Sequence, residues 1–537
     1  MFYMEYVVGQ FTARDCLRVW RARPVLSHLG YVQILWQLVF VIYCHTVNSA
    51  VMHYFLISFE DPIPYYACGF WSTKDCNIMK YNYTVNQDCI RTREPYVYCA
   101  GLYSTYPEYQ YWRYYILGLR KSHFHVAWRV GLASLVLSTV GYVSYFKRLK
   151  SLRWVLAFVS TYPTIGYSIL VMGSMVQRGI VEKFEDAFDT DFSKFVKYFN
   201  FSGMVIEVIF GMKIGTGLSF NLSSRTSFRS PCYSNCVVAT VISCVATILG
   251  ICINAMMTCP YAFDYGMRPG AVLIDKMSYT FEKATRLLHS YHSTGLWLVL
   301  TFSSITVTAL SLNIIVISGI LEMIEIRNPS AARYPGFMAF AAAITLYLLT
   351  LPMLSNVGFN FVMDFKRVFR IIAILMVIME NIVFVLWYGL EKFSEDIHFM
   401  QGTQPRSWVK VGWVLSSVVL AYVFCVEAYY MYTISLNSLG NIAGWWVFVA
   451  SVIWILFVPI VRLLVGAYKK RFTEMVRLDP KWGPKSEVLQ RSRAMFTAQA
   501  MTKEYMYRQY HLQAGIVSRQ KRSNIRNPDL GGNRQST

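Results

Sequence analysis

The stretch VIEVIFGMKIGTGLSFNLSSR, residues 205–225, decides how the rest of the chain is interpreted. It is apolar enough to enter a bilayer, but glycines and charges interrupt it: Gly211, Gly215, Gly217, Glu207 and Lys213. Backbone that leaves a helix at membrane depth is tolerated only where it lines a cavity or is buried in protein. Ionisable groups inside a membrane usually mark a pathway or a site. The stretch predicts a broken helix at a central binding site. The alternative is a continuous buried helix whose small residues allow close packing.

The composition defines the class of protein. The 537 residues are 55% hydrophobic and 15% charged, with a mean hydropathy of +0.36. These values exclude a soluble globular protein and a disordered one. The net charge of +21 comes from basic residues in short loops and in the C-terminal tail, as the positive-inside rule predicts. The expected partner is therefore the lipid bilayer and not nucleic acid.

Apolar runs near the length of a bilayer crossing predict ten helices after Met1–Gly9, which has the character of a helix end. They cover 30–58, 126–146, 153–177, 203–224, 236–257, 294–321, 335–353, 361–389, 409–431 and 442–467. The basic segments 146–153 and 469–471 indicate a cytoplasmic C-terminus. Residues 60–125 are then expected outside the cell.

The predicted outer segment has features of a secreted loop. Its cysteines are Cys68, Cys76, Cys89 and Cys99. Four cysteines allow three pairings, and we favour the short-loop pair Cys68–Cys76. A sequon at Asn82 predicts glycosylation.

Several segments, in this order, resemble the neurotransmitter:sodium symporters, which are sodium- and chloride-dependent transporters. They are FYMEYVVGQ (2–10), the helix 30–59, VIFGMKIGTG (208–217), CYSN (232–235), ISGILE (317–322) and FSEDIHFMQG (393–402). The likeness extends to about residue 470, and Cys68–Cys76 falls where the family has its outer disulfide. It implies an all-α polytopic membrane protein of inverted-repeat symporter fold with broken helices.

Measured against the family's twelve helices, this chain is N-terminally truncated. It lacks the first helix and most of the second, which leaves about ten complete transmembrane helices. An incomplete gene model starting at Met1 is the favoured explanation, and true absence of the helix is the alternative. The expected parts are 1–29 (helix end and cytoplasmic loop), 30–467 (transporter domain) and 468–537 (a flexible cytoplasmic tail).

The resemblance implies a solute site around the broken helix. Its residues in this chain are Tyr43, Cys44, Phe210, Met212, Gly215, Thr216 and Thr308. Phe210 keeps the family's aromatic gate position. Cys44 replaces a tyrosine, and a thiol cannot reproduce that tyrosine's hydrogen bond to a substrate carboxylate.

The ion sites implied by the resemblance are altered in this chain. The positions are Glu207, Gly211, Lys213, Ser243, Thr247 and Val307. Gly211 replaces a serine that binds sodium and chloride, and Val307 replaces an aspartate, although sodium requires oxygen ligands. Glu207, in place of a glutamine, could make chloride unnecessary. Lys213, in place of a glycine, could stand in for a sodium ion, snorkel to an aqueous cavity or pair with Glu207.

Two gate positions and one carboxyl pair complete the expected site. Glu322 occupies the inner gate position without its usual N-terminal arginine partner, and Lys366 replaces the acid of the outer gate. The resemblance places Glu380 near Glu5, and two such carboxyl groups would hold one proton between them. The sequence contains no metal cluster, nucleophile triad or phosphate-binding loop.

These observations predict a divergent symporter-like protein of the plasma membrane. It would move a small organic solute, such as an amino acid, amine or osmolyte, by alternating access. Sodium and chloride are implied by the resemblance but are doubtful given the altered sites, and self-association is left open. The alternative is a non-transporting relative with a regulatory or scaffold role. No enzymatic activity is expected.

Overall fold

The computed structural model describes residues 1–74, 76, 107–119, 124–146, 149–188, 198–264, 280–435, 439–479 and 482–496. Within these ranges the chain is helical, with a single isolated β-bridge between Val126 and Ser355 and no strand. Nine helices in the described ranges are long and apolar enough to cross a membrane. The prediction of an all-α polytopic membrane protein is confirmed.

The helices agree with the predicted spans to within a few residues at most ends. The first six long or broken elements are α3 (Leu29–Ile57), α7 (Trp128–Phe146), α8 (Leu149–Met175), α10 (Tyr198–Gly211), α11 (Leu218–Ser223) and α12 (Cys232–Asp264). The later long helices are α15 (Thr294–Arg327), α16 (Pro335–Thr350), α17 (Gly358–Asn381), α19 (Ser407–Ser435) and α20 (Leu439–Tyr468). The shorter helices are α1 (Phe2–Thr12), α2 (Cys16–Val19), α6 (Pro107–Gln110), α9 (Ile180–Phe188), α14 (Thr280–Leu288), α18 (Leu390–Gln401), α21 (Phe472–Val476) and α22 (Glu487–Ala494).

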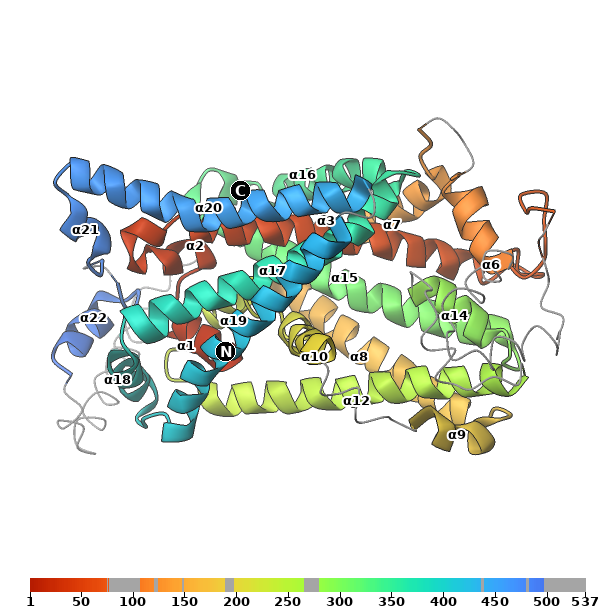
Figure 1. Cartoon of the computed structure of the whole chain (residues 1–537), viewed down its shortest axis with the longest axis horizontal. Coiled ribbons are helices and arrows are strands. Elements are labelled where there is room, and N and C mark those ends of the chain that lie inside the picture. Colours follow the sequence, from red (N-terminus) through yellow and green to blue (C-terminus); the bar gives the residue numbers. More distant parts are fainter. Residues whose placement is uncertain are drawn as a thin grey trace, which may run out of the picture.

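The long helices run roughly along one axis, and the short ones gather at its two ends (Figure 1). One end carries α6, α9 and α14, and we call it the disulfide end because the Cys68–Cys76 bond lies in the loop after α3. The other carries α18, α21 and α22 and is called the tail end. The predicted Cys68–Cys76 pairing is confirmed. Asn82, Cys89 and Cys99 lie outside the described residues.

The stretch 205–225 is broken as predicted. α10 ends at Gly211 and α11 starts at Leu218. Between them the backbone enters the left-handed region at Lys213, Gly215 and Gly217, with φ of 57°, 80° and 77°. The alternative of one continuous helix is wrong.

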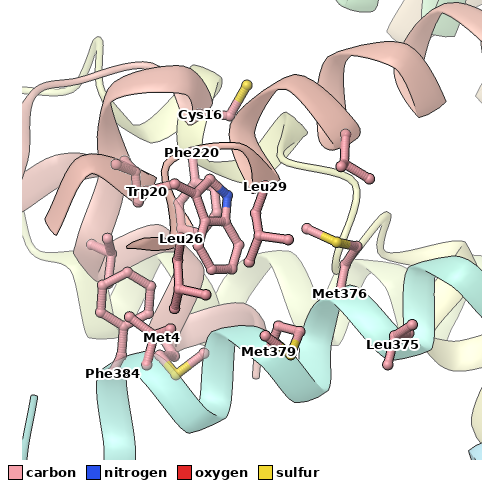
Figure 2. Packing of buried hydrophobic residues seen from close by; sticks show 14 of the residues in the cluster. Met4, Cys16, Trp20, Leu26, Leu29, Phe220, Leu375, Met376, Met379 and Phe384 are labelled. Atoms are coloured by element: carbon pink, nitrogen blue, oxygen red, sulfur yellow. The ribbon is translucent and has the colours of Figure 1, made fainter. Parts of the chain in front are cut away.

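A buried apolar cluster fixes the break from the tail end (Figure 2). Met4 of α1, Phe220 of α11 and Met376 of α17 are each no more than 1% exposed. Trp20 lies among them, and its indole N–H donates to Gln33 Oε1 at 2.7 Å. Burying this much apolar surface, with the indole N–H satisfied, holds these helices together.

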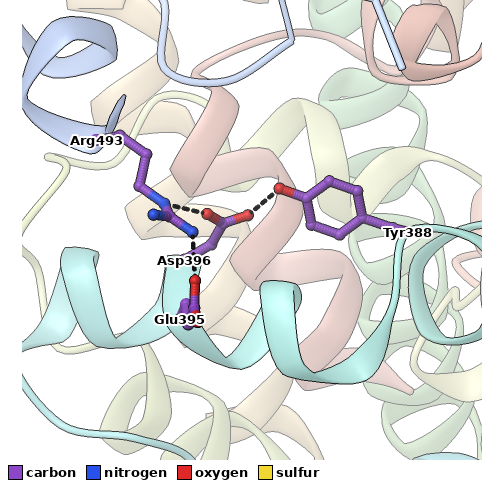
Figure 3. Close-up of polar contacts among 4 residues, drawn as sticks. All are labelled: Tyr388, Glu395, Asp396 and Arg493. Carbon is purple, nitrogen blue, oxygen red and sulfur yellow. Dashed lines mark hydrogen bonds and ion pairs between the residues drawn. The ribbon is translucent and has the colours of Figure 1, made fainter. Parts of the chain in front are cut away.

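The first part of the tail is folded, which differs from the flexible segment that we expected. The Arg493 guanidinium, on α22, donates to Asp396 at 2.6 Å and to Glu395 at 3.1 Å, both on α18 (Figure 3). The Tyr388 hydroxyl donates to the other oxygen of Asp396 at 2.6 Å. Burial raises the pKa of Asp396, and the charge of Arg493 opposes that shift. The tail is therefore fastened to α18 by a largely buried network.

Candidate functional site

The break is stabilised by partners for its freed backbone groups. The Gly215 N–H donates to Glu5 Oε1 at 2.5 Å, and the Gln37 side chain donates to the Thr216 carbonyl at 2.7 Å. The Thr216 hydroxyl donates to the carbonyl of Lys213 at 2.6 Å. Because buried backbone groups must be hydrogen-bonded, these side chains allow the helix to stop and restart inside the bundle.

Two carboxyl groups adjoin behind the break. Glu5 and Glu380 are both fully buried, and their side chains contact each other. Gln33 Nε2 donates to Glu380 Oε1 at 2.9 Å, whereas the Oε2 atoms of both acids are buried without a hydrogen-bond partner. One proton shared by the pair would satisfy both atoms. The two acids lie together, as the sequence suggested.

Two glycines of the break are required by geometry. Gly215 has φ +80°, and a Cβ there would lie 2.6 Å from Val377 Cγ2 of α17. Gly217 has φ +77°, and a Cβ there would lie 2.9 Å from Gln33 Oε1. Gly211 differs, because nothing lies within 4 Å of the position that its Cβ would take.

Aromatic rings fill the centre of the bundle beside the break. Phe40 stacks on Phe369 with centroids 4.7 Å apart, and Phe210 meets both edge-on at 5.6 Å. With Tyr43 and Phe365, among others, these rings line a cavity of about 10 Å³. This volume has room for about one water molecule, so the structure is closed around the predicted solute site.

Three charged side chains surround these rings. The Lys213 ammonium lies 4.1 Å from the centroid of Phe210 and 4.8 Å from that of Phe40. Glu207, with 62% of its side chain exposed, forms an ion pair with Arg370 of α17. Arg370 also lies 5.4 Å from the Phe210 ring. Glu207 therefore has a partner from another helix, and Lys213 is directed towards aromatic faces.

The remaining predicted solute-site residues are distributed around the break. Cys44 packs partly buried against the main apolar cluster, and Met212 packs against a second cluster with α17 and α19. Thr308 and Val307 lie on α15, where the Thr308 hydroxyl donates to the Ser304 carbonyl at 2.8 Å. Neither residue of α15 lines the small aromatic cavity.

The polar positions predicted on the next helix do not reach that cavity either. Ser243 and Thr247 lie on α12, and the Thr247 hydroxyl donates to the Ser243 carbonyl at 2.8 Å within the helix. In the described part of the chain, no group of three or more histidine, cysteine or acidic residues could hold a metal ion.

One gate residue has a partner that the sequence did not predict. Glu322, near the end of α15, forms an ion pair with Arg225, which follows α11. The side chains are 45% and 28% exposed. At the other gate, the structure describes the backbone of Lys366 in α17 but not its side chain.

Sequence reasoning missed Phe40, Phe369 and Arg225. A signal for the rings was present, because Trp36 and Phe40 are four residues apart, as are Phe365 and Phe369, so each pair shares a helix face. Trp36 stacks on Phe365 at 5.7 Å. The pairing of Arg225 required knowledge of how α11 approaches α15.

A bundle of membrane-spanning helices around a broken helix defines a membrane transporter of the symporter fold. The model of the sodium:neurotransmitter symporter family matches residues 1–466, and the chain belongs to that family. Its members are transporters and not enzymes.

Known relatives include transporters of several solutes. The sodium- and chloride-dependent neutral and basic amino acid transporter B(0+) of Homo sapiens is 21% identical, over 90% of this chain and 81% of its own length. The sodium- and chloride-dependent glycine transporter 1 of Xenopus laevis is 20% identical, over 90% and 80%. The sodium- and chloride-dependent creatine transporter 1 of Bos taurus is 21% identical, over 83% and 71%.

Proposed function

We propose that this protein is a secondary transporter of a small organic solute in the plasma membrane. The observation that carries the proposal is the break between α10 and α11, whose backbone is stabilised by Glu5 and Gln37 in the middle of the bundle. Family membership supports the same activity. The transport step would be alternating access, in which part of the bundle moves around the break.

The solute class is proposed from the relatives and from the size of the site. The named relatives carry amino acids and creatine, so a small zwitterion or a comparable osmolyte is the first class to test. The aromatic cavity of about 10 Å³ must enlarge to admit such a molecule. Movement of Phe210 away from Phe40 and Phe369 is the simplest opening, because Phe210 is the ring that α10 contributes.

We further propose that ion coupling differs from that of the named relatives. Sodium prefers several oxygen ligands, whereas Gly211 has no side-chain oxygen and Val307 is apolar. Glu207 carries a fixed negative charge that would make chloride unnecessary, although it is paired with Arg370. The residues that the resemblance aligns with the ion sites therefore do not fit the ions, and we assign no transport step to them.

The orientation follows from charge. Lys469, Lys470 and Arg471 follow α20 at the tail end, and the positive-inside rule places such segments in the cytoplasm. The disulfide end, with Cys68–Cys76, would then face outwards, in an oxidising environment.

A second candidate function is a non-transporting membrane protein with a regulatory or scaffold role. The filled aromatic centre and the apolar Val307 favour it.

Uptake into proteoliposomes decides between the two candidates. Liposomes with the purified chain would be given labelled amino acids and creatine, with sodium chloride outside or with both ions replaced. Accumulation above empty liposomes that persists without sodium supports altered coupling, and Lys213→Gly should then make uptake sodium-dependent. If sodium dependence is the same in both proteins, the coupling proposal is wrong. If no solute accumulates, the second candidate is supported.

A further inference from the structure

The side chain of Lys213 is held against two aromatic rings in the middle of the bundle. Its backbone has φ +57°, which is unusual for a residue with a Cβ. From there the ammonium lies 4.1 Å from the centroid of Phe210 and 4.8 Å from that of Phe40. Both distances are within the range in which a cation is attracted to a ring face, and the attraction grows when water is excluded.

The rings are fixed by contacts that do not involve Lys213. Phe40 stacks on Phe369, and Phe210 meets both edge-on. Phe40 and Phe369 are each 5% exposed. Because aromatic neighbours hold them, the two rings facing Lys213 should keep their positions when the lysine side chain is removed.

Arg370 is the other cation beside Phe210. Its guanidinium carbon is farther from the ring, at 5.4 Å, and its charge is paired with Glu207. Lys213, in contrast, approaches both rings at shorter distances. The ammonium of Lys213 is therefore the cation that fits the pair of rings.

We propose that Phe40 and Phe210 form a binding site for an alkylammonium ion and that Lys213 is its built-in occupant. The protein's own cation then keeps small organic cations out of the centre of the bundle. This inference deepens the proposed function, on which it rests in treating the break as the solute site. Ammonium binding is measured on purified protein without transport, so failure of one proposal is distinguishable from failure of the other.

The direct test is chemical complementation of Lys213→Ala. Alanine keeps a Cβ at the left-handed position, so the backbone strain stays similar, and n-propylammonium replaces the side-chain atoms that are lost. We expect the variant to bind n-propylammonium at least about tenfold more tightly than the unaltered protein, because a desolvated cation–π site forms with an external cation. Binding would be measured by isothermal titration and by the rise in Tm, with sodium chloride at equal ionic strength as reference.

Lys470→Ala is the matched control. Lys470 is also a lysine with positive φ, at 54°, but it is exposed and lies at the end of α20. The control should bind n-propylammonium no better than the unaltered protein, and adding Phe210→Leu to Lys213→Ala should abolish the gain. The proposal is overturned if Lys213→Ala binds no better than Lys470→Ala, or if loss of the Phe210 ring leaves the gain intact.

A second measurement keeps Lys213 in place and serves if Lys213→Ala does not fold. Lysine acylation would be quantified by mass spectrometry, with Lys470 as the internal reference. Phe210→Leu removes one ring and should raise the labelling of Lys213 relative to Lys470 by at least about threefold, because the ammonium loses a partner worth a measurable free energy. An unchanged ratio contradicts an ammonium held by these rings.

Discussion

The two halves of the broken helix differ in burial and in chemistry. Five of the six residues of α11 are buried, and Asn221 Oδ1 accepts from the backbone N–H of Cys16 at 3.0 Å. α10, in contrast, exposes Glu207 and Val208 and places its charge opposite Arg370. The difference teaches that the shape of the break is fixed on the α11 side, where backbone and buried polar groups meet closely. The α10 side tolerates changes in charge and side-chain chemistry.

The largest effect should come from Gly215→Ala. The new methyl group would stand at φ +80° and crowd Val377. Left-handed strain of about 1–2 kcal/mol and overpacking of about 1–3 kcal/mol should together lower the yield of monodisperse protein and its Tm. Gly211→Ala is the control on the α10 side, with nothing within 4 Å of its Cβ. Equal losses in both variants would remove the distinction between the two halves.

The next largest effect concerns Glu5. Glu5→Ala leaves the Gly215 N–H without its acceptor, and a buried unsatisfied donor costs about 1–3 kcal/mol. Glu5→Gln keeps an acceptor oxygen and should restore most of that stability. The measurement is Tm in detergent for the two variants. If glutamine is no better than alanine, the hydrogen bond to Gly215 does not stabilise the break.

A smaller effect is expected where α11 meets the end of α15. The ion pair between Arg225 and Glu322 is partly exposed, and such pairs contribute less than about 1 kcal/mol. A double-mutant cycle with Arg225→Ala and Glu322→Ala should therefore give a coupling energy below that limit, falling further at high salt. A coupling above about 2 kcal/mol would show that the α11 side is held by charge as well as by packing.

The smallest effect should be Gly211→Ser. The hydroxyl group enters open space on α10, so the free energy of unfolding should change by less than about 0.5 kcal/mol. The variant also replaces the side-chain oxygen that the family has there. A large loss of stability would mean that α10 is as constrained as α11.

Much of the fold was predictable from the sequence because membrane helices declare themselves by length and hydropathy. The glycines around Lys213 predicted the break, and the spacing of Cys68 and Cys76 favoured their disulfide. The aromatic centre was not predicted, because Phe40 and Phe369 are ordinary apolar residues until α3 and α17 are brought together. The partner of Glu322 was not predicted for the same reason, since Arg225 lies far from it in sequence.

The folded part of the tail changes how truncation experiments should be interpreted. Phe496, 7% exposed, packs against Phe399, and Trp482 stacks on Phe384 at 6.0 Å. Removing the polypeptide after α20 would uncover these rings and leave the buried Asp396 without Arg493. A shortened protein retained in the endoplasmic reticulum would then reflect damage to its core, and not the loss of a trafficking signal.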